Sequence, residues 1–301
     1  MNIKPWIQAA RLRTLPLSIS GIIVGSAYAY FQGYSDWRIV VLALLTTLGL
    51  QILSNYANDY GDGVKGTDAN RIGEKRLVAA GVITAKQMKK AVLLTAGLTF
   101  AIAMLLIYIA FGKENFAMSL IFILLGIGSI GAAIKYTVGK NAYGYSGFGD
   151  LFVFIFFGLV SVVGSNFLFT HFVDWKIFLP ATAIGMLSMA VLNLNNMRDI
   201  ENDRVADKNT LVVKMGLKWA KNYQHFLVIV PFVLLFVFSL MIHTRLSLSY
   251  LVFVFLLLHL GRVRAAKKYE DFDPELKKVA LSTFVLSLIF WLAILIKDLN
   301  F

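Results

Sequence analysis

Long, unbroken runs of apolar residues dominate the chain and are separated by short segments that carry most of the charge. A membrane-crossing helix needs about 20 predominantly apolar residues, and runs of roughly that length recur along the whole sequence. The runs are continuous rather than alternating, which indicates helices and argues against barrel strands. We therefore predict an all-α integral membrane bundle of nine transmembrane helices. The expected spans are residues 15–31, 39–57, 91–111, 116–135, 149–168, 177–195, 226–243, 247–261 and 279–296.

The basic residues between these runs predict how the bundle is oriented. With the N-terminus in the cytoplasm, the cytoplasmic segments hold 24 of the 29 Lys and Arg residues. Cytoplasmic connections carry an excess of Lys and Arg, so this split places the N-terminus in the cytoplasm and the C-terminus outside. The two longest cytoplasmic connections, 58–90 and 196–225, lie on the same face. We expect a single domain, residues 1–301, built from two half-bundles that each lead into one of these acidic loops.

Composition supports a membrane protein and excludes several kinds of site. The 301 residues are 58% hydrophobic and 15% charged, whereas a soluble domain carries about 25% charged residues. The sequence has no cysteine, which excludes thiolate metal sites, disulfides and a thiol nucleophile. The net charge of +12 comes from residues between apolar runs, where orientation in the membrane explains them. We therefore expect a lipid bilayer and no nucleic acid as partner.

Acidic and amide residues gather in two stretches, each of which begins where an expected span ends. In the first stretch, spacings of three and four place polar side chains on one helix face: Asn55, Asn58, Asp59 and Asp62. The second stretch repeats the arrangement with Asn195, Asp199 and Asp203. If the two faces meet, four or five carboxylates come together. Such a cluster is electrostatically unstable unless cations neutralise it.

The ligand types indicate which cation this is. Oxygen ligands without His or Cys select a hard cation, Mg²⁺ or Mn²⁺. Magnesium readily shares its shell with phosphate oxygens, and basic residues beside both stretches can meet the remaining phosphate charge. These are Lys65, Arg71, Lys75, Arg76, Arg198, Arg204 and Lys208. The sequence thus predicts one magnesium–diphosphate site.

Plainer explanations stay open at this point. Carboxylates just outside a span are often ordinary solvated residues, and the asparagines Asn55, Asn193 and Asn195 would also serve as interhelical hydrogen-bonding groups. A further acidic cluster within 270–275 has no amide residues beside it. We interpret that cluster as a solvated loop.

The two stretches resemble a known pair of motifs. NDYGDGVKGTD and NNMRDIENDRVADKNTL are similar to the two aspartate motifs of the UbiA superfamily of membrane prenyltransferases. The D-x-x-D-x-x-x-x-x-D spacing of the first is most similar to the branch that prenylates 1,4-dihydroxy-2-naphthoate. Residues 6–16, the Y-x-x-x-K segment at 136–140 and the stretch 145–150 also fit, so the resemblance covers essentially the whole chain. Leu12, Glu74 and Asp207 depart from the pattern without removing a presumed ligand.

The resemblance implies a magnesium-dependent aromatic prenyltransferase of the bacterial cytoplasmic membrane. It would transfer a polyprenyl chain from polyprenyl diphosphate to 1,4-dihydroxy-2-naphthoate, with loss of CO₂ and diphosphate, giving demethylmenaquinol for menaquinone biosynthesis. By motif, the metal ligands would be Asp59, Asp62, Asp68, Asp199 and Asp203, with all but Asp68 also counted as catalytic. The diphosphate would contact Asn58, Arg71, Lys140, Arg198 and Lys208. Other substrate contacts would be Asn55, Tyr136 and Asn195.

Other functions are compatible with some of these sequence features. An enzyme of the same superfamily would act on another aromatic acceptor, such as 4-hydroxybenzoate or homogentisate. A divalent-cation transporter would also explain acidic clusters in a membrane protein, but it predicts carboxylates near the bilayer midplane. A non-catalytic lipid-binding protein is a third possibility. Arg11 and Arg13 are either topology determinants or contacts for the acceptor's carboxylate.

Overall fold

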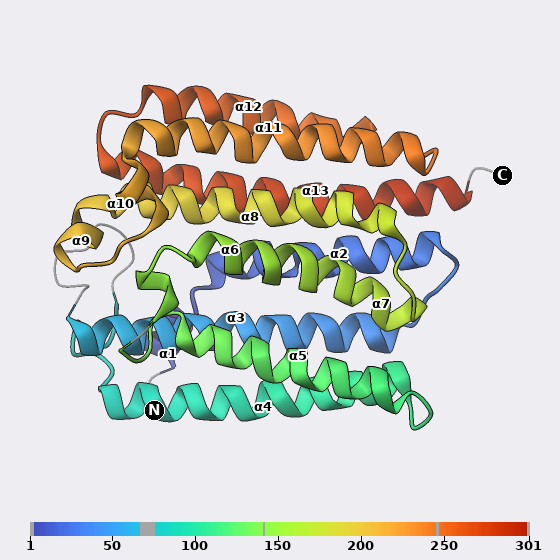
Figure 1. The fold of residues 1–301 in the computed structure, drawn as a ribbon, viewed down its shortest axis with the longest axis horizontal. Helices are drawn as coiled ribbons and strands as arrows, with labels where there is room; N and C mark the ends of the chain where they lie inside the picture. The colour runs from blue at the N-terminus through green and yellow to red at the C-terminus, as the bar shows by residue number, and fades with distance from the viewer. Residues whose placement is uncertain (1–2, 67–75, 141, 245–246, 300–301) are drawn as a thin grey trace.

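The long helices lie side by side along one axis (Figure 1). The structure, a computed structural model, describes residues 3–66, 76–140, 142–244 and 247–299, and its regular elements there are helical. The long helices are α2 (Leu15–Phe31), α3 (Trp37–Lys65), α4 (Ala85–Phe111), α5 (Phe116–Lys135), α8 (Phe178–Arg198), α11 (Leu217–Met241), α12 (Ser247–Ala265) and α13 (Asp273–Leu299). A further crossing joins α6 (Gly149–Val153), a π-helical stretch (Phe154–Gly164) and α7 (Ser165–Thr170).

Three short helices lie at one end of the bundle, together with the C-terminal end of α3 (Figure 1). They are α1 (Lys4–Ala10), α9 (Ile200–Val205) and α10 (Leu211–Met215). We call this end the acidic-loop end, because both acidic stretches of the sequence lie there.

Eight helices among the described residues are long and apolar enough to cross a membrane. The multi-pass, all-helical part of the prediction is therefore confirmed. The expected span 247–261 falls on α12, which is not one of these eight. The count of nine spans, the orientation and the two half-bundles stay predictions.

Several helices extend beyond the apolar runs that predicted them. The α3 helix continues to Lys65, past the expected end at residue 57, so the first acidic stretch lies on its last turns. Gly66 then ends α3 in a left-handed conformation (φ 74°), which residues other than glycine rarely adopt. A capping box between Thr84 and Gln87 starts α4. Hydropathy locates only the apolar part of each helix, whereas these end signals set its true length.

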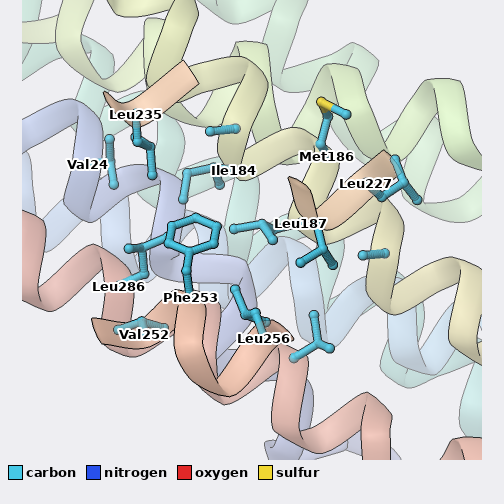
Figure 2. Packing of buried hydrophobic residues seen from close by; sticks show 14 of the residues in the cluster. Val24, Ile184, Met186, Leu187, Leu227, Leu235, Val252, Phe253, Leu256 and Leu286 are labelled. Atoms are coloured by element: carbon cyan, nitrogen blue, oxygen red, sulfur yellow. The ribbon is translucent and has the colours of Figure 1, made fainter. Parts of the chain in front are cut away.

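The largest apolar core joins α8 to α2, α11 and α13. Val24 of α2, Leu187 of α8, Leu227 of α11 and Leu286 of α13 all belong to it (Figure 2). The π-helical stretch also lies very close to α8, because a Cβ on Gly158 would be only 2.7 Å from the carbonyl oxygen of Ala181. Helix α8, which leads into the second acidic stretch, is thus held on several sides. It ends at Arg198, and Asp203 lies on α9, so Asn195, Asp199 and Asp203 do not share one continuous helix as expected.

Candidate functional site

The end of α3 places Asp62 in a buried polar environment. Its Oδ2 lies 3.1 Å from Nη2 of Arg76, and both side chains are 5% exposed. Its Oδ1 accepts a hydrogen bond of 2.8 Å from the hydroxyl of Tyr145. The first acidic stretch is therefore tied both to the segment that returns to α4 and to the segment that follows α5.

Asp59, three residues earlier on α3, has a different set of partners. Its two carboxylate oxygens accept hydrogen bonds from the backbone N–H groups of Leu77 (3.0 Å) and Val78 (2.9 Å), and the residue is 1% exposed. This carboxylate anchors the chain where it returns towards α4. Asp59 was expected to bind metal, and the structure places it against backbone amides.

Arg198 and Asp199 form a bidentate ion pair at the end of α8. Nε and Nη2 of Arg198 lie 2.7 and 2.8 Å from the two carboxylate oxygens of Asp199. Nη2 also donates to Oδ1 of Asn195, and Nη1 donates to Asp273 at the start of α13. The guanidinium is fully buried, so Arg198, expected at the diphosphate, binds protein carboxylates in this structure.

The remaining residues of the second stretch approach the first. Nζ of Lys208 lies 3.3 Å from Asp203 and 5.7 Å from the ring centre of Tyr145. Because the hydroxyl of the same tyrosine bonds Asp62, the two acidic stretches lie on either side of one aromatic side chain. Two regions more than a hundred residues apart in sequence are thus brought together at one end of the bundle.

A cavity of about 410 Å³ opens between the helices at this place. Its polar end is lined by Asn55, Asn58 and Asp62 of the first stretch, by Arg76 beside that stretch, and by Asn195 and Lys208 of the second. Further along, apolar side chains such as Leu106, Phe122 and Leu168 line it. The cavity therefore combines a charged end with a long apolar wall, a form that suits an amphipathic ligand.

A row of aromatic rings lines the cavity between these two parts. Ring centres lie 5.3 Å apart for Tyr136 and Tyr143, 3.9 Å for Tyr143 and Phe152, and 6.1 Å for Phe152 and Phe156. Burial raises the pKa of the Tyr136 hydroxyl, and the nearby carboxylates of Asp150, Asp203 and Asp62 raise it further. Tyr136 is consequently a neutral hydrogen-bond donor at physiological pH.

Asn55 joins the cavity to the N-terminal segment. Its Nδ2 donates to the carbonyl oxygen of Ala10 (2.8 Å) and lies 3.1 Å from Oγ1 of Thr14, which Gln51 also contacts. Arg11 and Arg13, on the same segment, line the cavity as well. The structure therefore places Asn55 at the cavity. It also shows Asn55 as an interhelical hydrogen-bonding residue, which was the alternative explanation from sequence.

Not every predicted residue reaches the cavity. Of the described aspartates, Asp62 lines it, whereas Asp59, Asp199 and Asp203 do not. Lys140 lines a neighbouring surface pocket instead. Asp68 and Arg71 lie outside the described residues. Within the described ranges, no three carboxylate or imidazole groups gather closely enough to hold a metal ion by themselves.

One expectation about the acidic loops is wrong in part. The cluster at 270–275 was expected to be solvated, and Glu270 and Asp271 are exposed, but Glu275 is 3% exposed and is bonded to His259, Arg262 and Lys278. Gln224 of α11 links His259 to Asn193 of α8, which also donates to the carbonyl oxygen of Ala220. Asn193 is thus an interhelical hydrogen-bonding residue.

Sequence reasoning missed the contacts of Tyr145, the Arg76–Asp62 ion pair and the aromatic row. Arg76 was recognised only as one of several basic neighbours, and aromatic residues are common throughout this chain. For Tyr145 the available signal was its place in a segment that resembles the superfamily.

Comparisons with known proteins agree with this geometry. The UbiA prenyltransferase family matches residues 18–295. The 1,4-dihydroxy-2-naphthoate octaprenyltransferase of Escherichia coli (strain K12) is 47% identical over 78% of this chain and 76% of its own length. The enzyme of the same name from Haemophilus influenzae is 40% identical over 98% of this chain and 97% of its own, and that from Mycobacterium tuberculosis is 37% identical over 94% of each.

Solved structures show the same fold. A UbiA homologue from Archaeoglobus fulgidus bound to GPP and Mg²⁺ superposes with a TM-score of 0.67, at 16% identity, over 96% of this chain and 99% of that one. The apo UbiA homologue from Aeropyrum pernix K1 gives 0.66 at 15% identity over 99% of both chains. The family match covers nearly the whole described bundle and both acidic stretches, and the chain therefore belongs to the UbiA prenyltransferase family.

Proposed function

We propose that this protein transfers a polyprenyl chain from polyprenyl diphosphate to 1,4-dihydroxy-2-naphthoate, releasing CO₂ and diphosphate. The product is demethylmenaquinol, an intermediate of menaquinone biosynthesis. The choice of acceptor is supported by the relatives at 37–47% identity, which are named for this naphthoate. The observation that carries the reaction type is the cavity, whose charged end joins an apolar wall.

The charged end suits the diphosphate of the donor. Arg76 and Lys208 supply positive charge where negative charge develops on the departing diphosphate, and Tyr136 and Asn58 offer neutral hydrogen bonds. The apolar wall takes the isoprenoid tail and excludes water from the allylic carbon. The faces of Tyr143, Phe152 and Phe156 stabilise positive charge on that carbon until the electron-rich acceptor ring attacks it.

The donor set also fits magnesium. Carboxylate and amide oxygens of Asp62, Asn58 and Asn195 line the cavity, and Asp203 lies beside Lys208. Magnesium usually takes one or two protein carboxylates and completes its shell with water and phosphate oxygens, so a large carboxylate cluster is not required. Bound here, magnesium or manganese would neutralise charge on the leaving group.

The setting we propose is a bacterial cytoplasmic membrane, with the acidic-loop end facing the cytoplasm. The distribution of Lys and Arg along the sequence supports this orientation. The donor would then enter with its tail in the bilayer and its diphosphate at the membrane surface.

The test is direct. Purified protein is incubated with Mg²⁺, a polyprenyl diphosphate and either 1,4-dihydroxy-2-naphthoate, 4-hydroxybenzoate or homogentisate. We expect diphosphate release and a decarboxylated prenyl product with the naphthoate. Turnover with another acceptor only would correct the substrate, and metal flux in liposomes without diphosphate turnover would favour a transporter.

A further inference from the structure

Tyr145 lies between the two acidic stretches and contacts both. Its hydroxyl donates to Oδ1 of Asp62 at 2.8 Å, and its ring has the ammonium of Lys65 at 3.9 Å and that of Lys208 at 5.7 Å from its centre. Its backbone carbonyl oxygen accepts a hydrogen bond of 3.0 Å from the N–H of Asn209. One residue thus connects the end of α3 to the segment after α9.

The turn around Tyr145 is fixed on both sides. Nζ of Lys214 donates to the carbonyl oxygen of Ser146 at 2.9 Å, and a Cβ on Gly147 would lie only 3.0 Å from the carbonyl oxygen of Asn209. On the other side, Oγ1 of Thr137 donates to the carbonyl oxygen of Ala57 at 3.1 Å. Thr137 and residues 145–147 therefore contact the two stretches from between them.

Tyr145 lies beside two hollows. The cavity is lined by Asp62 and Lys208, which Tyr145 contacts, whereas Tyr145 itself lines a second pocket with Lys65, Lys140 and Ala206. The second pocket is open to the surface at the acidic-loop end. Tyr145 therefore contacts lining residues of the cavity on one side and lines the open pocket on the other.

We propose that Tyr145 is a positioning residue with two functions: its hydroxyl holds Asp62 in register with the second stretch, and its ring keeps water from the charged end of the cavity. This inference rests on the proposed function, because both roles matter only if a metal-bound prenyl diphosphate occupies that end. A cation–π contact with Lys65 keeps the ring in place after the hydroxyl is lost.

Water exclusion has a chemical consequence. If water reaches the activated donor, the allylic C–O bond breaks and its electron pair leaves with the diphosphate. The water oxygen then bonds to the carbon and its proton passes to the solvent, which gives a free prenol. The ring and the hydroxyl are therefore separable by two variants, Tyr145→Phe and Tyr145→Ala.

The first measurement is binding of farnesyl diphosphate to the purified protein as Mg²⁺ is varied, without acceptor. Loss of a hydrogen bond to a charged group should raise the half-saturating Mg²⁺ concentration of Tyr145→Phe by about tenfold. The matched control is Tyr269→Phe. The Tyr269 hydroxyl donates a hydrogen bond of 2.9 Å to Glu201, and neither residue lines the cavity. An unchanged Mg²⁺ dependence in Tyr145→Phe would overturn the positioning role.

The second measurement is farnesol released per bound donor. We expect Tyr145→Phe to release no more farnesol than the wild type and Tyr145→Ala to release several-fold more. Equal release from the two variants would overturn the shielding role. If the wild-type protein binds no farnesyl diphosphate in Mg²⁺, the proposed function itself fails. If the wild type and every variant bind it equally well, only the role of Tyr145 fails.

Discussion

Arg198 donates a hydrogen bond to Asp273 across 75 residues of sequence. The same guanidinium holds both carboxylate oxygens of Asp199, so the start of α13 supports the second acidic stretch through one buried arginine. Nη1 of Arg13, on the N-terminal segment that borders the cavity, lies 4.0 Å from Asp273. Three segments of the acidic-loop end therefore meet at Asp273.

Removing the charge of Asp273 should loosen this junction. Asp273→Asn leaves the buried Arg198 with Asp199 as its remaining carboxylate partner in these contacts. The Asp273 side chain is 37% exposed, so we expect a modest loss of about 1–2 kcal/mol, seen as a lower melting temperature in detergent. The control is Asp271→Asn, whose carboxylate accepts from the backbone N–H groups of Lys267 and Lys268. Equal melting temperatures for the two variants would contradict the role of Asp273.

The buried Glu275 should matter more for stability. It is 3% exposed and bonds three basic side chains, and its partner His259 connects it through Gln224 to α8. Glu275→Gln removes the carboxylate that His259, Arg262 and Lys278 share. Because the Arg262 and Lys278 side chains are nearly half exposed and stay solvated, we expect a loss of about 2–3 kcal/mol. Glu270→Gln, at an exposed position five residues earlier, should change the melting temperature little. A Glu275→Gln protein as stable as wild type would show that this network contributes nothing.

Two glycines on long helices should respond oppositely to alanine. A Cβ on Gly61 of α3 would lie 2.7 Å from Oγ1 of Thr137 and 2.9 Å from its backbone carbonyl, so Gly61→Ala should push Thr137 away from α3. Overpacking of this kind costs about 1–3 kcal/mol, and donor binding should weaken as well. Gly97 of α4 has open space, and alanine favours a helix by about 0.5–1 kcal/mol there. Thermal melting and donor binding of both variants test this, and a harmless Gly61→Ala would refute the close contact.

The sequence predicted the helical membrane fold, because apolar run length is a local property. The orientation of the spans and the resemblance to a pair of motifs led to the prediction that Asp62, Asn195 and Lys208 belong to one site, and all three line the same cavity. It did not reveal that Asp59 binds backbone amides or that Arg198 turns towards Asp273. Those partners come from distant segments, and spacing within one helix cannot identify them.

The misread segment at 270–275 illustrates the same limit. Acidic residues outside an apolar run look alike in sequence, yet Asp271 caps a turn at the surface while Glu275 is buried among basic groups. The difference depends on His259 of α12, and nothing in the local pattern marks that histidine as a partner. Tyr145 was similarly inconspicuous, because its neighbours belong to two other segments.

The central claim is that the two acidic stretches form one shared site, and equilibrium binding of farnesyl diphosphate in Mg²⁺ tests it most directly. Wild-type protein should bind one donor per chain and lose it on chelation of the metal. Asp62→Asn and Asp203→Asn should each weaken binding by at least about tenfold, because Asp62 lines the cavity and Asp203 holds Lys208, which lines it too. The double variant should lose less than the sum of the single losses in binding free energy, because both substitutions act on one binding site. Binding of two donors per chain, with each variant removing one of them, would contradict the account.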